Sequence, residues 1–322
     1  MATVNTPSTI EGWIQEEQGS DVIQALAKTS VVDTYGRPEP MKSDTKKVPR
    51  SGDVPVTGVD KNSVYDFSGD DNDSILLTAR KAGTIITLAD EDMADSSVDF
   101  VSTKQKDWAR GWGKYFDNAT LAVSAQGDGS TTKPYNSLYY QLKTGGDATI
   151  GYTAGENYLA TASGHVGVTY DLLDEMWALV EDSDWWEDEN MLVIANTKVK
   201  SSLRGIKDGQ QRPLFVQGTQ NVPDTLWDVP IRYSRGAKVS ATATYNPTGA
   251  GGAAGTTGNP LMFIVNTRLL VVGKRSGPEW KYASSDSGPA FTSDQALLKA
   301  RARRGFGYGN LFGAAVLELC QN

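Results

Sequence analysis

The sequence predicts an α+β fold in which a few helices cover short strands, and three observations carry this prediction. Residues 96–125 and 169–182 repeat apolar side chains at the three- and four-residue spacing of amphipathic helices. Residues 191–196 and 261–273 are short apolar runs typical of buried strands. Residues 298–308 alternate between apolar and basic side chains, which is the period of a strand with one buried face. Short strands mixed with a few helices indicate the α+β class.

The longest predicted helix, residues 96–125, carries an aromatic stripe that we expect to face the core. Ser96 and Asp99 fit the S/T-x-x-D/E pattern of a helix start. About 25 residues at about 1.5 Å each predict a rod of about 38 Å. The stripe consists of Val101, Trp108, Trp112 and Phe116.

The composition excludes several classes of protein. The 322 residues include 31 basic and 39 acidic ones, a net charge of -8, so any contact with nucleic acid is expected to be local. One cysteine, Cys320, and one histidine, His165, exclude a disulfide framework, a cysteine zinc cage and a multi-histidine metal site. His165 is expected to be a solvated loop residue. We expect no cofactor, because the sequence has no phosphate-binding glycine motif, and no membrane partner, because no apolar run reaches about 18 residues.

Two segments at the start of the chain are predicted to need a neighbouring body. Residues 1–45 contain a short amphipathic piece, 13–27, followed by a polar stretch with two prolines, and read as an arm. Residues 46–90 read as a long two-stranded excursion with a turn cluster at 67–74 and a strand break at Gly83. A two-stranded hairpin alone is marginally stable in water.

The second half of the chain predicts several short elements. Residues 197–208 indicate a short helix, residues 209–216 a turn into a strand, and residues 226–234 a further short strand. Residues 236–260 are rich in Gly, Ala and Thr and form a loop too poor in apolar side chains to fold alone.

Residues 300–312 match part of the ribonucleoprotein signature of RNA-binding sheets, but alternation argues against that function. Phe306 and Tyr308 share a face with the alanines of the strand, which need a core, whereas aromatics that read RNA must be exposed. The segment is therefore interpreted as a structural strand. Its other face carries Lys299, Arg301 and Arg303.

Acids and tryptophans lie together at residues 182–190, which raises a carbohydrate-binding module or a hydrolase as an alternative of another class. A glycosidase needs two carboxylates held across a cleft. The acids here are consecutive in a predicted turn, so we do not favour this alternative.

The order of the segments resembles the major capsid proteins of tailed double-stranded DNA bacteriophages, whose Hong-Kong-97-like fold is shared with encapsulin shells. The resemblance includes a strand and an acidic start before a long spine helix, and the passage "LRGIKDGQQRPLF". The sequence departs from the family pattern at Asp228, where a glycine is usual, and at Asn310-Leu311-Phe312, where a proline is usual. The stretches that carry the resemblance are residues 86–134, 168–215, 226–234 and 299–319.

The resemblance implies a division of the chain into regions. In this family the arm and the extended loop overlap adjacent subunits, which accounts for the two segments that need neighbours. The implied regions are an N-terminal arm (1–45), an extended loop (46–85), a peripheral domain with the spine helix (86–165), an axial domain (166–290) and closing strands of the peripheral domain (291–322).

The resemblance also implies a function. The chain would be a capsid protein without enzymatic activity that self-assembles as pentamers and hexamers into an icosahedral shell around double-stranded DNA. It would belong to the virion and assemble in the host cytoplasm. Implied partners are a separate scaffolding protein, a portal, a decoration protein and, through non-specific contact, the packaged DNA. The alternative within the same fold is an encapsulin-type compartment, which encloses a protein cargo.

Two sets of residues are candidates for contacts between subunits. Lys299, Arg301 and Arg303 are expected to pair with acidic groups of a neighbour or to meet DNA. Some relatives join a lysine of the extended loop to an asparagine of a neighbouring subunit. Lys61 is the candidate lysine, with Lys46 and Lys47 as poorer choices and Asn310 as a guess for the acceptor.

Overall fold

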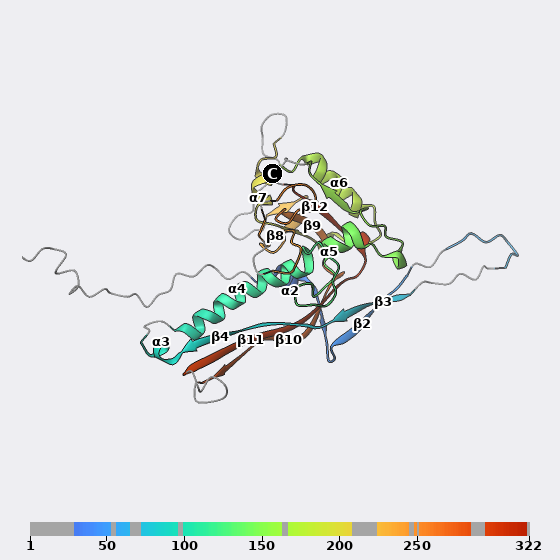
Figure 1. Cartoon of the computed structure of the whole chain (residues 1–322). Coiled ribbons are helices and arrows are strands. Elements are labelled where there is room, and N and C mark those ends of the chain that lie inside the picture. The colour runs from blue at the N-terminus through green and yellow to red at the C-terminus, as the bar shows by residue number, and fades with distance from the viewer. Residues whose placement is uncertain are drawn as a thin grey trace, which may run out of the picture.

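The computed structural model describes residues 29–52, 56–64, 72–95, 99–162, 167–207, 224–244, 248–249, 251–284 and 294–320. Figure 1 shows a body built on one sheet, a long second sheet with a helix lying along it, and a hairpin that projects in the opposite direction. The α+β class is confirmed by this mixture of helices and sheets. Within the described residues, no helix is both long and apolar enough to cross a membrane.

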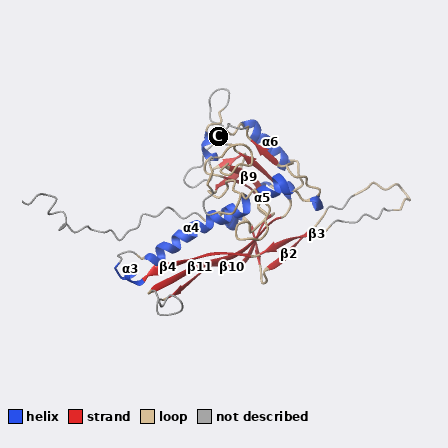
Figure 2. Ribbon diagram, in the orientation of Figure 1, coloured by secondary structure: helices blue, strands red, loops and turns tan. Residues whose placement is uncertain are grey.

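A four-stranded sheet forms the elongated part of the molecule. Its strand order is β1-β10-β11-β4, in which β1 pairs parallel to β10 and the other pairs are antiparallel. Helix α4 (Phe100–Leu121) lies along one face of this sheet (Figure 2). The strands are β1 (Arg37–Pro40), β10 (Leu270–Ala283), β11 (Gln295–Tyr308) and β4 (Arg80–Ala89).

A six-stranded mixed sheet forms the body. Its strand order is β5-β12-β9-β6-β8-β7. Every residue of β6 and β9 is buried, as expected for central strands covered on both faces. The strands are β5 (Tyr158–Ala160), β12 (Ala314–Glu318), β9 (Leu261–Asn266), β6 (Met191–Ala195), β8 (Val229–Tyr233) and β7 (Thr225–Leu226).

The helices and short turns complete the chain. The predicted helix at 169–182 is confirmed as α6, whose cap residue Thr169 accepts a hydrogen bond from the backbone of Leu172. The predicted short helix within 197–208 is confirmed as α7. These elements are α2 (Val31–Tyr35), α3 (Asp90–Asp95), α5 (Leu138–Tyr140), η2 (Gln141–Gly145), η3 (Ala148–Ile150), α6 (Tyr170–Glu181), η4 (Asp188–Asn190), α7 (Val199–Arg204) and η6 (Leu311–Gly313).

Helix α4 is shorter than the predicted 96–125. Asp99 is its N-cap, because the Asp99 carboxylate accepts a hydrogen bond from the backbone of Ser102, and the helix ends at Leu121. Ser96, the predicted start, lies outside the described residues. The 22 residues of α4 correspond to about 33 Å at 1.5 Å per residue.

Two predicted strands are each divided in the structure. The apolar run 261–273 contains β9 and the start of β10, which belong to different sheets. Residues 226–234 contain the end of β7 and all of β8, and these two strands form a hairpin. Trp227 (φ 46°) and Asp228 (φ 65°) form its tight turn in the left-handed region, which two-residue hairpins require. Aspartate tolerates this conformation better than most residues, so it replaces the glycine expected there.

The strand break predicted at Gly83 is wrong, and the two-stranded excursion is shorter than predicted. It consists of β2 (Thr45–Arg50) and β3 (Asp73–Thr78), and the break falls at Ala79. Strand β4 continues through Gly83 and pairs with β11. A Cβ at Gly83 would lie 2.4 Å from the Ala300 carbonyl oxygen, so this glycine permits close approach of two strands. The hairpin of β2 and β3 therefore ends at Thr78, and the next strand, β4, begins at Arg80.

Residues 29–45 were predicted to belong to an arm that needs a neighbouring body, but they pack within the chain itself. Val31 and Val32 of α2 are buried in the main core, and β1 pairs with β10. The amphipathic piece 13–27, His165 and residues 209–216 lie outside the described residues.

The predicted closing segment, 291–322, contributes strands to both sheets. Strand β11, which includes the predicted strand 298–308, lies in the four-stranded sheet, and β12 lies in the six-stranded sheet. Beside this crossover runs a second one, from β9 to β10. The Gly309 N–H donates to the Leu269 carbonyl (2.7 Å) between them. Tyr308 also links them, because its hydroxyl accepts from the Asn266 N–H (3.3 Å) and donates to the Gly313 carbonyl (2.8 Å).

Candidate functional site

The aromatic stripe of α4 forms a continuous stack against the four-stranded sheet. The Trp112 ring stacks on Trp108 (centroids 5.6 Å apart) and on Phe116 (5.4 Å). Trp108 meets Trp280 of β10 edge-on at 5.1 Å. Trp112 and Phe116 are buried, Trp108 and Val101 are half-buried, and Val101 packs in a small cluster at the far end of the sheet. The stack fixes α4 to the sheet along its length.

The three basic candidates of β11 lie on the face of the sheet opposite α4. Arg301 pairs with Glu279 (2.6 Å) and Arg303 with Asp44 (2.6 Å), both within the same chain. Lys299 is exposed. The hydrogen bonds and charge of Arg301 hold the pKa of Glu279 below its usual range. The two arginines thus already have acidic partners before any neighbour is present.

Arg304, which the sequence analysis did not select, is buried on the apolar face of β11. Its guanidinium donates to both carboxylate oxygens of Asp33 (2.9 and 3.3 Å) and to the Ser276 carbonyl. The alternation of β11 already indicated a role for this residue, because Arg304 lies on the same strand face as Ala302 and Phe306. An arginine on a buried face needs a partner. The pair fixes α2 to the four-stranded sheet.

A second buried group, Asp117 of α4, holds the same N-terminal segment. Its carboxylate accepts from the Ser30 hydroxyl (2.5 Å), from the backbones of Val31 and Val32 (3.1 Å each) and from the Ser234 hydroxyl (2.5 Å). Burial raises the pKa of Asp117, although these hydrogen bonds oppose the shift. Asp117 therefore joins α2, α4 and the end of β8 at one point.

Arg50 anchors the hairpin of β2 and β3 to the rest of the chain. Arg50 pairs with Asp73 across the hairpin, and it also donates to Asp147 (2.9 Å) and to the Gly309 carbonyl (3.0 Å) of the body. Residues 56–64, beyond this anchor, project from the molecule (Figure 1). Val56 and Val64 there are 94% and 87% exposed. Fully exposed valines on a projecting loop are typical of a surface that another chain covers.

The lysines proposed for a covalent link differ in their surroundings. Lys61 is exposed in the turn of the projecting segment, and Lys47 is exposed on β2. Lys46 is engaged with Glu39 (2.7 Å). Asn310 is buried and its side chain accepts from the backbone of Phe312. Asn310 thus caps a turn inside the chain, and its role as an acceptor stays a hypothesis.

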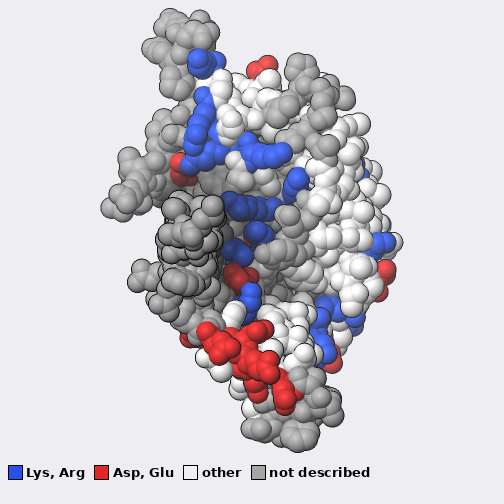
Figure 3. Space-filling model, turned by 60° about the vertical axis from the view of Figure 1, so that its left-hand side comes forward, with Lys and Arg blue, Asp and Glu red and all other residues white. Residues whose placement is uncertain are grey.

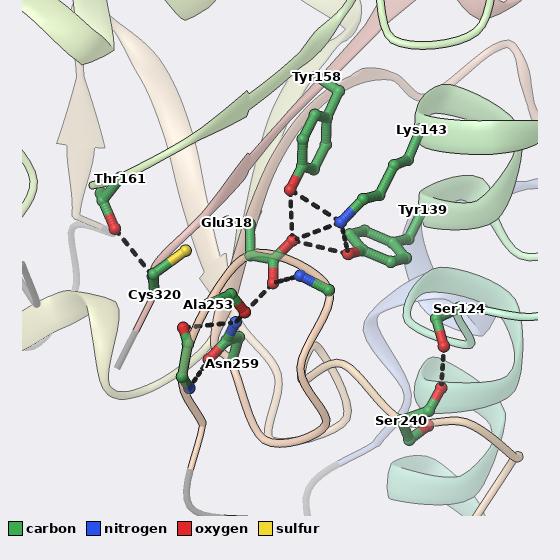
Figure 4. A network of polar contacts seen from close by, with 12 residues as sticks. Ser124, Tyr139, Lys143, Tyr158, Thr161, Ser240, Ala253, Asn259, Glu318 and Cys320 are labelled. Atoms are coloured by element: carbon green, nitrogen blue, oxygen red, sulfur yellow. Dashed lines mark hydrogen bonds and ion pairs between the residues drawn. The ribbon is translucent and has the colours of Figure 1, made fainter. Parts of the chain in front are cut away.

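A buried carboxylate, Glu318, organises the polar network shown in Figure 4. It accepts hydrogen bonds from the Tyr139 hydroxyl, the Tyr158 hydroxyl, the Asn259 amide and the Gly255 backbone, each at 2.6 Å. Lys143 lies 3.3 Å away. Burial alone would raise the pKa of Glu318, but these donors hold it below its usual range. The carboxylate fixes the glycine-rich loop after 248 to β12 and to the turn around Lys143.

The acids and tryptophans at 182–190 are used for local structure. The Trp186 indole donates to Asp188 (2.6 Å), and Glu187 pairs with Arg268 (3.2 Å) and accepts from Asn190 (2.6 Å). Among the residues that the structure describes, no three His, Cys, Asp or Glu side chains are grouped so as to hold a metal ion. The described arrangement is one of contact surfaces and structural anchors.

The fold and these surfaces define a structural protein with projecting parts, and the comparisons give its family. Residues 12–252 match the Phage capsid family, and the chain belongs to this family.

A curated relative is the probable major capsid protein gp17 of Mycobacterium phage L5, 22% identical over 229 residues. The match covers 70% of this chain and 65% of that relative, so the chain spans about two thirds of its length.

Solved structures share the fold over nearly the whole chain. A chain from Mycobacterium phage Ogopogo aligns with a TM-score of 0.72 at 13% identity, covering 99% of this chain and 100% of the other. The capsid of a native GTA particle aligns with a TM-score of 0.69 at 13% identity, with the same coverage. The fold is therefore the Hong-Kong-97-like capsid fold that the sequence resemblance implied.

Proposed function

We propose that this chain is the major capsid protein of a tailed phage, a shell subunit that performs no chemistry. Pentamers and hexamers of the chain would build an icosahedral shell around double-stranded DNA, with assembly in the host cytoplasm. A separate scaffolding protein, a portal and a decoration protein would be further partners. Membership of the Phage capsid family is the observation that carries the proposal.

Parts of the chain receive roles within this proposal. The six-stranded sheet with α6 and α7 would be the axial domain, and the four-stranded sheet with α4 would be the peripheral domain. The projecting segment between Arg50 and Asp73 would overlap a neighbouring subunit. Its exposed valines support this role, because a neighbour that covers them removes apolar surface from water.

Electron microscopy of the purified chain tests the proposal. We expect closed icosahedral shells from the wild-type chain, alone or with its scaffolding protein. A variant in which residues 51–72 are replaced by a short glycine-rich turn should keep its circular dichroism spectrum but lose closed shells. A wild-type chain that forms no shells under either condition would contradict the proposal, and shells that enclose a protein cargo without DNA would favour an encapsulin-type compartment.

A further inference from the structure

Helix α4 has a basic stripe on the side that faces away from the sheet. Lys106, Arg110 and Lys114 follow one another at four-residue intervals, so they share one face of the helix. They are offset by two residues, roughly 200°, from Trp108 and Trp112, which pack on the sheet. Lys106 is exposed and the other two are half-buried. The stripe is therefore on the surface of the molecule.

The loop after β8 continues this stripe toward the body. Asn118, the next position on the same helix face, donates its amide to the carbonyls of Gly236 and Lys238 (3.0 Å each). A Cβ at Gly236 would lie 2.7 Å from the Lys114 carbonyl oxygen. Because the loop packs closely against α4 here, Arg235 and Lys238 lie at the end of the stripe.

The stripe thus combines basic residues of α4 with basic residues of the loop after β8. The five residues of this surface, called the α4 stripe below, are Lys106, Arg110, Lys114, Arg235 and Lys238. Figure 3 shows basic side chains gathered in a band, with an acidic cluster at its lower end.

The surroundings of the α4 stripe fit a polyanion better than a protein surface. Positions beside it on the helix are small or polar: Ser102, Thr103, Ala109 and Gly113. A protein interface normally has an apolar core, and no large apolar side chain flanks the stripe on α4. Asp107 is the acid beside it, 3.2 Å from Arg110. Five basic residues are thus concentrated on one surface of a chain of net charge -8.

The spacing of the α4 stripe suits the backbone of double-stranded DNA. Lys106 and Lys114 are about 12 Å apart along the axis, whereas duplex DNA carries one charge per about 1.7 Å. Each basic side chain can reach a phosphate at any register of the duplex. Such contacts are independent of base sequence, as a packaged genome requires.

We infer that the α4 stripe is the surface that contacts the phosphate backbone of packaged double-stranded DNA, so that this side of the subunit faces the shell interior. The inference rests on the proposed function. The basic face of β11 lies on the opposite side of the sheet from the α4 stripe. Only one of two opposite faces can line the interior, so the test below compares the α4 stripe with Lys299, Arg301 and Arg303.

Two triple variants with equal charge changes test the inference. One is K106Q/R110Q/K114Q, and the matched control is K299Q/R301Q/R303Q. Binding of each full-length chain to a fluorescently labelled duplex of about 30 base pairs is measured by anisotropy between 50 and 200 mM salt. Each lost phosphate contact lowers the slope of log K against log salt by about 0.9. We expect the slope to fall by about 3 for the α4 variant and to stay at the wild-type value for the control.

Wild-type slopes in the α4 variant, or an equal loss in the control, would overturn the inference. Electron microscopy of the same proteins gives the second readout. The α4 variant should still build shells, which should protect less DNA from nuclease than wild-type shells do. A folded α4 variant that builds no shells would show that the stripe contacts protein, and the inference would fall. If the wild-type chain builds no shells, the proposed function fails instead.

Discussion

The buried carboxylate Glu318 gives a prediction whose size follows from its contacts. The variant E318Q keeps the shape of the side chain but removes its charge and one acceptor oxygen. One oxygen of Glu318 accepts from Gly255 and Asn259, and the other accepts from Tyr139 and Tyr158, with Lys143 at 3.3 Å. If the remaining oxygen of glutamine keeps the two loop contacts, its amide faces the two tyrosine hydroxyls. Lys143 then loses its charged partner but still donates to the hydroxyls of Tyr139 (2.8 Å) and Tyr158 (2.9 Å).

Hydrogen bonds to a charged group contribute about 1.5 to 3 kcal/mol each, and the tyrosine hydroxyls can rotate to accept from the new amide. We therefore expect E318Q to lower the free energy of unfolding by about 2 to 4 kcal/mol. Urea unfolding of the unassembled chain at pH 7 measures this. The matched control is E279Q, whose carboxylate is at the surface beside Arg301, and we expect only a small change there.

The pH dependence provides an independent check of the same reasoning. The donors hold the pKa of Glu318 below its usual range, so its ionised form stabilises the folded chain above the pKa of an unfolded glutamate, about 4.3. This stabilisation is lost as the pH falls through the lower folded pKa. The stability difference between wild type and E318Q should therefore shrink in acid. A difference below about 0.5 kcal/mol at pH 7, or one that stays constant down to pH 3, would refute the role given to Glu318.

Three further predictions follow from the contacts described. Replacing Trp112 with alanine removes a buried ring stacked on two others and should cost about 3 to 5 kcal/mol in urea unfolding; Trp227, which is 39% exposed, is the control, and equal losses would contradict the stack. D33N leaves the Arg304 guanidinium buried without a charged partner and should lower the unfolding free energy by about 2 to 3 kcal/mol, whereas R37Q, at an exposed ion pair, should change it little. If Lys61 forms a covalent link between subunits, denaturing electrophoresis of shells gives a ladder that K61R abolishes, and a single band near 34.7 kDa in the wild type would end that hypothesis.

Periodic patterns in the local sequence predicted many of the helices and strands correctly. The apolar spacing of α6, the fully apolar β6 and the alternation of β11 were all visible, because each is a periodic signal within one element. The run 261–273 showed no break, because nothing in its apolar sequence marks a change of sheet. The prediction of a strand break at Gly83 is wrong because a glycine is needed there for the close approach of the neighbouring strand. The local sequence does not contain that strand.

The polar anchors could not be found in the same way, because their partners are distant in sequence. Arg304 and Asp33 are 271 positions apart, and Asp117 is 86 positions from Val31. Only Arg304 gave a sequence signal, through its place on the apolar face of the strand. The basic residues of β11 were selected correctly as a face, but their partners Glu279 and Asp44 become visible only when the chain is folded.

The paired crossovers between the sheets have a mechanical consequence. Two separate chain passages, residues 267–269 and 309–313, cross side by side and are joined by the bond from Gly309 to Leu269 and by the two hydrogen bonds of Tyr308. A single connecting segment would let the two sheets rotate relative to each other, whereas two hydrogen-bonded segments resist both bending and torsion. Force applied to one sheet is therefore transmitted to the other. We expect changes of shell curvature to arise from movements of whole subunits.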